Sequence, residues 1–271
     1  MSTKYSNASI RAPAVAGFFY PQDPAELRDC VSELLDAVSV NASLQAPKAF
    51  IVPHAGYVYS GSTAASVYAT AAQHKATLRR VVLLGPSHRV YLEGAAVPES
   101  AAFATPLGIV PVDVELKSRL RDLPGVIESD RPHALEHSLE VQLPFLQLAI
   151  GEFTLLPLVL GRASAQEVAR ILDAVWGDAD TLILASSDLS HYHSYREAQR
   201  IDAQTSAAIM NRRPTLSGEQ ACGAVAINGL LYSARSKHLD VQELARCNSG
   251  DTAGDKDRVV GYGAYALYDA H

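Results

Sequence analysis

The stretch Asp180-Thr181-Leu182-Ile183-Leu184-Ala185-Ser186-Ser187-Asp188-Leu189-Ser190-His191-Tyr192-His193 joins an apolar run to a group of polar side chains. Residues 180–185 have the short, continuous apolar pattern of a strand that is buried on both faces. Hydroxyl, carboxylate and imidazole side chains follow directly, from Ser186 to His193. This change from apolar to polar predicts a functional site just beyond the end of the strand.

Two earlier apolar runs end in the same way. Ala49-Phe50-Ile51-Val52 leads into His54, and Val81-Val82-Leu83-Leu84 leads into His88. In open α/β sheets, ligands bind outside the carboxyl ends of the strands. The two histidines and the polar residues after Ala185 are therefore expected to share one site.

Apolar strand patterns alternate with helical patterns along the whole chain. The expected strands lie at 48–53, 79–85, 154–160, 180–185 and 259–268, and a hairpin or edge pair is expected within 94–112. The expected helices lie at 24–39, 63–73, 113–121, 136–150, 165–176, 195–211 and 217–234, with a loop at 246–258. This alternation predicts a three-layer α/β/α sandwich with a largely parallel, mixed central sheet.

The sequence contains no evident linker, repeat or low-complexity tract. Because the candidate site residues come from both halves of the chain, residues 1–271 are expected to form a single domain. With 48% hydrophobic and 19% charged residues, the chain has enough apolar side chains for a sizeable core.

The net charge, the lengths of the apolar runs and the number of cysteines argue against several classes of protein. A formal net charge of −6 argues against a role in binding nucleic acid or an anionic membrane. No apolar run is long enough for a transmembrane helix, and the N-terminal residues lack the order of a signal peptide. The three cysteines are odd in number and far apart, unlike a disulfide framework. A cytoplasmic protein is expected.

A cysteine adds a possible metal ligand to the strand-end residues. Cys222 falls in the first turns of the helix expected at 217–234, where a thiol has a lowered pKa. Imidazole suits iron, copper and zinc, and thiolate favours the softer of these ions. The combination of three strand-end histidines (His54, His88 and His191) with Asp188 and Cys222 therefore indicates a metal site.

The residues alone leave four functions open. The first is a non-haem metal centre that binds dioxygen and an oxygen-donor substrate. The second is zinc-dependent hydrolysis at two histidines and a cysteine. The third is a nucleophile, Ser187 or Cys222, activated by His191, although no Gly-x-Ser-x-Gly motif is present. In the fourth, the histidines recognise a peptide or partner without catalysis.

Several short motifs in the chain resemble those of one family. They are Ala16-Gly17-Phe18-Phe19-Tyr20, Pro53-His54-Ala55-Gly56-Tyr57, Gly85-Pro86-Ser87-His88, Glu136-His137-Ser138-Leu139-Glu140, Ser186-Ser187-Asp188 with His191, Cys222-Gly223 and Gly261-Tyr262-Gly263-Ala264. In this order they resemble the Memo family (mediator of cell motility), called AmmeMemoRadiSam system protein B in prokaryotes. The resemblance covers essentially the whole chain.

The resemblance implies a fold similar to the catalytic subunit of class III extradiol dioxygenases, which use non-haem iron(II) to open catechol rings. It makes His54 and His88 the imidazole ligands and Cys222 the third protein ligand of a mononuclear metal. The dioxygenases have a glutamate where the Memo pattern has Cys222, and a thiolate changes the softness and redox behaviour of the site. The implied metal is iron(II), with copper and then zinc as alternatives.

The same resemblance assigns the remaining site residues. His191 takes the position of the acid–base residue, and Asp188 lies in the same pocket as a further polar group or ligand, so that both are expected catalytic residues. His137, Tyr57 and Ser87 line the pocket or lie behind the ligands.

The expected function is therefore that of a dioxygenase-like, metal-dependent redox enzyme of unknown substrate. A non-catalytic protein that binds a peptide or partner in the same cleft is the second hypothesis, and a zinc hydrolase is the third. The expected ligand is a small molecule or a peptide, with no nucleic acid and no membrane. The family resemblance also implies a functional link to AMMECR-type and radical SAM proteins.

Overall fold

A central sheet of nine strands organises the computed structural model, which describes residues 9–40 and 45–270. Four parallel strands form its middle, in the order β2 (Ala49–Val52), β9 (Thr181–Ser186), β3 (Arg80–Pro86) and β8 (Thr154–Leu160). Their side chains are almost all buried, as in parallel strands that are covered on both faces. The carboxyl ends of β2, β9 and β3 consequently lie next to one another.

Shorter and antiparallel strands complete the sheet on both sides. Beside β2 lies β12 (Val259–Asp269), which also pairs with β11 (Leu239–Asn248) and β10 (His191–His193). Beyond β8 lie β4 (Ala95–Val97) and β7 (Val126–Glu128). A separate three-stranded sheet contains β1 (Ile10–Arg11), β5 (Ala102–Thr105) and β6 (Gly108–Pro111). The main sheet is therefore mixed, as predicted.

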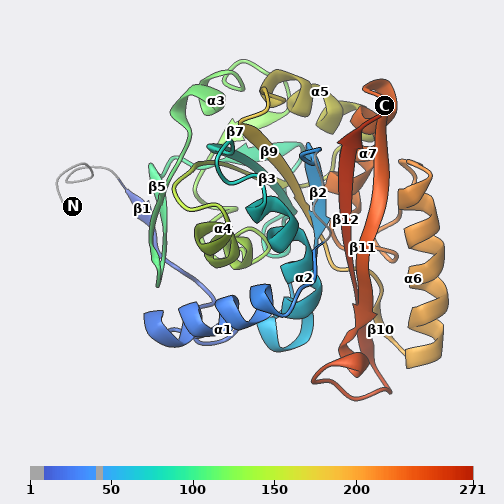
Figure 1. The fold of residues 1–271 in the computed structure, drawn as a ribbon. Helices are drawn as coiled ribbons and strands as arrows, with labels where there is room; N and C mark the ends of the chain where they lie inside the picture. Colours follow the sequence, from blue (N-terminus) through green and yellow to red (C-terminus); the bar gives the residue numbers. More distant parts are fainter. Residues whose placement is uncertain (1–8, 41–44, 271) are drawn as a thin grey trace.

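Helices cover both faces of the sheet (Figure 1). One face packs against α1 (Pro24–Asp36), α2 (Tyr57–Ala72) and α4 (Leu143–Ala149), which follows the short 3-10 helix η1 (Glu140–Gln142). The other packs against α3 (Val114–Ser118), α5 (Ala165–Val175), α6 (Tyr195–Met210) and α7 (Ala224–Ser236). Along β2, Phe50 and Val52 face the first layer, whereas Ala49 and Ile51 face the second. This arrangement confirms the α/β/α sandwich.

Local sequence signals set several helix starts. Asp23 caps α1 by accepting hydrogen bonds from the N–H groups of Ala25 and Glu26, and Pro24 occupies the first helical position. Ser164 and Glu167 form a capping box at the start of α5. Among the described residues, no helix is both long and apolar enough to cross a membrane.

Several segments differ from the sequence-based expectation. The helix expected from residue 136 begins only at Glu140, because the Glu136 carboxylate accepts N–H groups of His88 and Ser138 instead of capping a helix. The helix expected from 217 begins at Ala224, so Cys222 lies just before it. The loop expected from 246 begins with the end of β11 and a 3-10 helix, η2 (Ser249–Asp251).

Candidate metal centre

The strand order brings the predicted ligands to one edge of the sheet. His54 follows β2 and His88 follows β3, and these strands flank β9, which leads into Asp188. The register pairs Val52 of β2 with Ser186 of β9, so the two chains leave the sheet at the same level. Residues far apart in the sequence thus meet because their strands are parallel neighbours.

His54, His88 and Cys222 form a group whose possible ligand atoms all lie within 4.8 Å of one another. The Sγ atom of Cys222 is 3.2 Å from Nε2 of His54. The rings of His54 and His88 meet edge to face, with their centroids 5.2 Å apart. His54 is buried, whereas the His88 side chain is 29% exposed, so the group is open to solvent on the His88 side.

Cys222 reaches His54 because the chain around Gly223 packs tightly against the end of β9. The N–H of Gly223 donates to Oγ of Ser187 at 2.9 Å, and this oxygen is 3.9 Å from the thiol. A Cβ atom on Gly223 would lie 2.5 Å from the carbonyl oxygen of Ser186. Only glycine therefore permits this approach, which explains the Cys-Gly pair in the sequence.

Burial keeps the imidazole of His54 neutral and the thiol of Cys222 protonated without a metal. Burial lowers the pKa of His54 well below its ordinary value, and the neighbouring His137 and His88 act in the same direction. Burial, followed by the nearby Asp188, raises the pKa of Cys222 to about 12. A neutral imidazole is ready to bind a metal ion, whereas the thiol must release its proton on binding.

The donor set fits a transition metal. Two imidazoles and one thiol match the preferences of iron, copper and zinc. Calcium and magnesium instead take several oxygen ligands, which this group does not supply. The structure thus contains a possible metal-binding group made of the three residues that the sequence pointed to.

Glu136 orients His88 through Nδ1, the ring nitrogen that is not the proposed metal-ligand atom. Its carboxylate accepts the backbone N–H of His88 at 2.7 Å and lies 2.9 Å from Nδ1 of the ring. Burial alone would raise the pKa of Glu136, but the hydrogen bonds from His88 and Ser138 outweigh it and hold the pKa at about 2. The ionised carboxylate therefore accepts the proton on Nδ1, which leaves Nε2 of His88 as the free ligand atom.

The sequence did not single out Glu136, because a carboxylate before an apolar run also fits simple helix capping. The available signal was its place directly before His137 in the Glu136–Glu140 motif. The ring of His137 stacks on His88 with centroids 4.7 Å apart and meets His54 edge-on at 5.4 Å. His137 thus lies against the rings of His54 and His88, and His88, Glu136 and His137 form a second group of possible ligands.

Asp188 holds the loop that carries His54. Its Oδ1 atom accepts the backbone N–H of His54 at 2.7 Å, and the side chain is buried. Burial raises the pKa of Asp188 to about 7, although hydrogen bonds from the backbone of His54 and Ala55 act against this rise. The contact fixes the position of the His54 backbone relative to β9.

His191 is the first residue of β10 and is partly buried. Burial lowers its pKa, a hydrogen bond to Leu189 acts against this, and the charge of His88 lowers the pKa further. His191 in turn acts to lower the pKa of His54, after burial and the other two histidines. The next residue, Tyr192, has a φ of 62°, and the pairing of β10 with β12 shifts register at this point. Such a conformation is uncommon for a bulky residue.

The other two expected pocket residues make structural contacts. The hydroxyl of Tyr57 donates to the carbonyl of Val141 at 2.7 Å, and its ring packs on Phe145. The hydroxyl of Ser87 donates to the carbonyl of Val90 at 2.6 Å. These contacts support the loops around His54 and His88, and neither residue belongs to the group of possible ligands.

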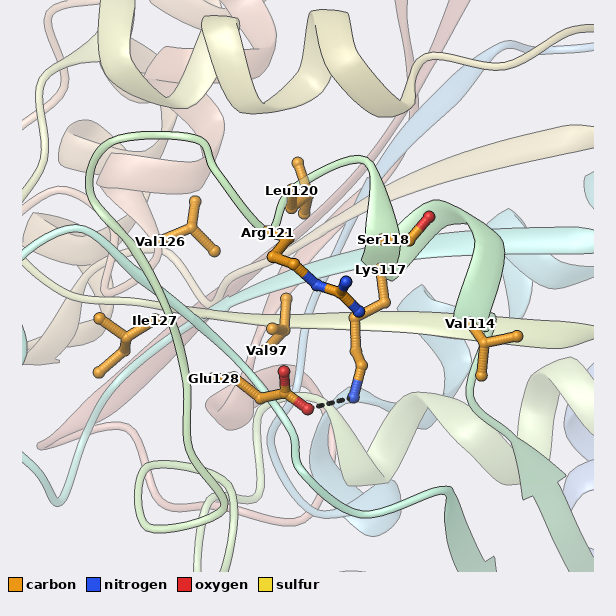
Figure 2. A pocket seen from close by; sticks show the side chains of 9 residues that line it. All are labelled: Val97, Val114, Lys117, Ser118, Leu120, Arg121, Val126, Ile127 and Glu128. Atoms are coloured by element: carbon orange, nitrogen blue, oxygen red, sulfur yellow. Dashed lines mark hydrogen bonds and ion pairs between the residues drawn. The ribbon is translucent and has the colours of Figure 1, made fainter.

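A pocket of about 350 Å³ lies elsewhere, between α3 and β7 (Figure 2). Its lining includes Val97, Leu120 and Val126, and the ion pair between Lys117 and Glu128 crosses it at 2.6 Å. None of the candidate site residues lines this pocket. It is therefore distinct from the metal-binding group.

Comparison with known proteins places the whole chain in one family. A family model described as Memo-like protein matches residues 11–266. A MEMO1 family protein of Aquifex aeolicus is 37% identical over 93% of this chain and 97% of its own length. A MEMO1 family protein of Thermoplasma volcanium is 36% identical, over 93% of this chain and 96% of its own length.

A solved structure shares the general fold at much lower identity. An uncharacterized protein, JW3007, from Escherichia coli K12 aligns with a TM-score of 0.50 and 13% identity, covering 80% of this chain and 98% of that chain. This likeness concerns the fold alone. The family match and the relatives, which extend over nearly the full length, show that this chain belongs to the Memo family.

Proposed function

We propose that the chain is a metal-dependent redox enzyme, dioxygenase-like in chemistry, whose iron(II) or copper is held by His54, His88 and Cys222. The observation that supports it is the convergence of these three donors within 4.8 Å on the open side of the sheet edge. When bound, such an ion supplies one-electron redox chemistry and open positions for oxygen-donor ligands. Two neutral imidazoles and one thiolate would hold it.

His191 is the proposed acid–base residue. Because burial lowers its pKa, the ring is neutral near neutral pH and can accept a proton from a substrate hydroxyl. Its place on β10, outside the three ligands, leaves it free to act on a substrate. Asp188 contributes indirectly, by fixing the backbone of His54.

The substrate is proposed to be a small molecule or a peptide that enters on the His88 side, where the group is exposed. A functional link to AMMECR-type and radical SAM proteins remains a proposal that rests on family resemblance. A partner-binding role without turnover and a zinc hydrolase use the same residues, and the experiments below separate them from the redox enzyme.

Metal analysis after anaerobic purification tests the metal site. We expect about one iron or copper ion per chain in the wild-type protein and none in the variant His54→Ala with Cys222→Ser, because two of the three donors are then gone. The matched control, His238→Asn with Cys30→Ser, also replaces one histidine and one cysteine and should keep the metal. Asn is suitable at 238 because the residue has a φ of 56°.

Two results would contradict the redox proposal. Protein that stays metal-free after anaerobic reconstitution with iron(II) or copper would favour the binding protein. Stoichiometric zinc together with ester or amide turnover would favour the hydrolase.

Oxygen consumption tests the role of His191. With catechols as candidate substrates, we expect His191→Ala to lower the rate by about 10²–10⁴-fold, the usual contribution of a general acid–base group. The metal content should not change, because His191 is not one of the three donors. Equal rates in wild type and variant would remove His191 from the mechanism.

A further inference from the structure

A buried chain of polar side chains runs from the interior to the back of the His54 ring. It consists of Tyr68 on α2, Gln142 on η1 and Ser186 at the end of β9, and each is at most 1% exposed. The hydroxyl of Tyr68 is 2.5 Å from Oε1 of Gln142, and Nε2 of Gln142 is 2.9 Å from Oγ of Ser186. Oγ of Ser186 is in turn 2.9 Å from Nδ1 of His54.

The carbonyl of Pro53 fixes the orientation of Gln142. Nε2 of the amide is 2.9 Å from this carbonyl oxygen, which can only accept a hydrogen bond. Rotating the amide by half a turn would place two oxygen atoms against each other. The NH₂ group therefore faces both Pro53 and Ser186, and Oε1 accepts from Tyr68.

The carbonyl of Ser138 fixes the hydroxyl of Ser186 in the same manner. The two oxygen atoms are 2.6 Å apart, a distance that requires a proton between them. Since a carbonyl has none, the single proton of Ser186 points to Ser138. The Ser186 oxygen can then only accept, from Gln142 on one side and from His54 on the other.

This arrangement determines which nitrogen of His54 carries the proton. A neutral imidazole, the form that can bind a metal ion, has one N–H and one lone pair. With Ser186 accepting, the proton sits on Nδ1. The lone pair is then on Nε2, the atom that lies 3.2 Å from the thiol of Cys222.

We propose that Ser186 is a positioning residue that holds His54 in the Nδ1–H tautomer, with Gln142 and Ser138 holding Ser186 in its accepting state. The proposal rests on the proposed role of His54 as a metal ligand. In the opposite tautomer an N–H would face Cys222 and any ion, and binding would first require the proton to move. The chain therefore prepares the ligand atom before a metal arrives.

The tautomer can be observed directly in metal-free protein. Long-range ¹H–¹⁵N correlation spectra distinguish a protonated ring nitrogen from one with a lone pair, and the His54→Ala variant identifies the signals of His54. The sample is kept reduced and free of metal with a chelator. We expect protonated Nδ1 and unprotonated Nε2. A spectrum with the proton on Nε2 would overturn the proposal, whether or not the protein binds a metal.

Variants at Ser186 test its role. Ser186→Ala removes the acceptor, so both tautomers should appear, and the affinity for iron(II), measured anaerobically against a competing chelator, should fall by about 10–100-fold. Ser186→Thr keeps the hydroxyl and should restore the Nδ1–H form and most of the affinity. The control Ser233→Ala removes another buried hydroxyl, one that has no hydrogen-bond partner among the described residues. It should change neither the tautomer of His54 nor the affinity for iron(II).

The two proposals fail in different ways. Unchanged tautomer and unchanged iron(II) affinity in Ser186→Ala would show that Ser186 does not position the ring. Failure of wild-type protein to bind iron(II) or copper, with the Nδ1–H tautomer present and lost in Ser186→Ala, would overturn the metal site and leave the positioning role intact.

Discussion

Glu136 is the residue on which the orientation of His88 depends, and its charge is essential to that role. One oxygen accepts from the ring and from Ser138, and the other accepts from the backbone of His88. Glu136→Gln replaces one accepting oxygen by an NH₂ group that faces an N–H. We expect the affinity for iron(II) to fall by about 10–100-fold, as is usual when an outer hydrogen-bond partner of a ligand is lost.

The control for this change is Glu128→Gln, which removes the same charge from a half-exposed side chain paired with Lys117. Competition with a chelator should give wild-type affinity for this control. Equal affinities for Glu136→Gln and wild type would mean that His88 is oriented by other contacts, such as its stacking on His137.

His133 provides a pH-dependent contribution to stability away from the metal-binding group. Burial lowers its pKa from 6.5 to about 4, against a hydrogen bond to the carbonyl of Ala96 that acts to raise it. Nε2 is 3.1 Å from that carbonyl, so it carries the proton of the neutral ring, and Nδ1 is buried with no partner among the described residues. A second proton would therefore be buried without an acceptor.

Because the folded state resists this protonation, the unfolded state binds the extra proton between pH 6.5 and about 4. The free energy of unfolding should thus fall as the pH is lowered through this window, by at most about 1.4 kcal/mol per pH unit from this residue. Urea unfolding of wild type and His133→Gln should show a smaller loss in the variant. Parallel pH profiles would contradict the assignment.

The sequence predicts the strand-end histidines well but not the residues that orient them. His54 and His88 are visible because each follows a short apolar run, and that pattern is local. Ser186, Gln142 and Glu136 act through hydrogen bonds to residues 44 to 132 positions away. Their roles depend on strand order and register, which no local pattern contains.

At the scale of elements, a buried ion pair attaches the N-terminal segment to the site. Arg11 of β1 donates to the Glu140 carboxylate at 2.6 Å and to the carbonyls of His133 and Glu136. Glu140 also accepts from the hydroxyl of Tyr20. Both charged side chains are at most 5% exposed. The segment that contains Glu136 is therefore held by contacts with the start of the described chain.

Arg11→Met should destabilise the protein strongly. It leaves the charge of Glu140 buried without its cation, which typically costs about 3–5 kcal/mol. The control Arg200→Met breaks an exposed pair with Glu197 and should cost at most about 1 kcal/mol. Urea denaturation measures the free energy of unfolding of both variants. Equal losses in the two would show that the buried ion pair contributes no more to stability than the exposed one.

The junction between β9 and α7 is the element contact that brings Cys222 to the histidines. Gly223→Ala places a methyl group 2.5 Å from the Ser186 carbonyl, so the two segments must separate. We expect a loss of about 1–3 kcal/mol in stability and a weaker affinity for iron(II). At Gly218 a Cβ would meet no described atom within 4 Å, so Gly218→Ala is the matched control. Wild-type affinity in Gly223→Ala would contradict the positioning of Cys222 by this contact.

The elements that sequence reasoning found are those with a clear apolar period, such as β3 and α5. It missed β11, whose residues alternate between intermediate and exposed and include charged side chains, because the strand is covered only in part. It also extended the Cys222 helix too far towards the N-terminus. The backbone N–H of Ser217 does donate to Oε1 of the expected partner Gln220, but this bond closes a turn ahead of the helix.

At the scale of the whole molecule, the main sheet joins strands from both halves of the chain. β12, the last strand, pairs with β2 and also with β10 and β11. β9 from the second half lies between β2 and β3 from the first. Each layer of the apolar core therefore includes residues from both halves. No cut between β2 and β12 leaves either part of the chain with the complete main sheet.

This interleaving predicts that residues 1–271 unfold as one domain. The single tryptophan, Trp176, packs against the second core layer, with Lys237 4.7 Å from its ring, so its fluorescence reports on that layer. Far-ultraviolet circular dichroism reports on the whole sheet and its helices. With urea, the two signals should change at the same midpoint, as they do when unfolding is cooperative. Separate midpoints, with a plateau in which one half keeps its secondary structure, would show two independent domains. In that case the His54–Cys222 contact, which joins the two halves, would be lost at the first transition.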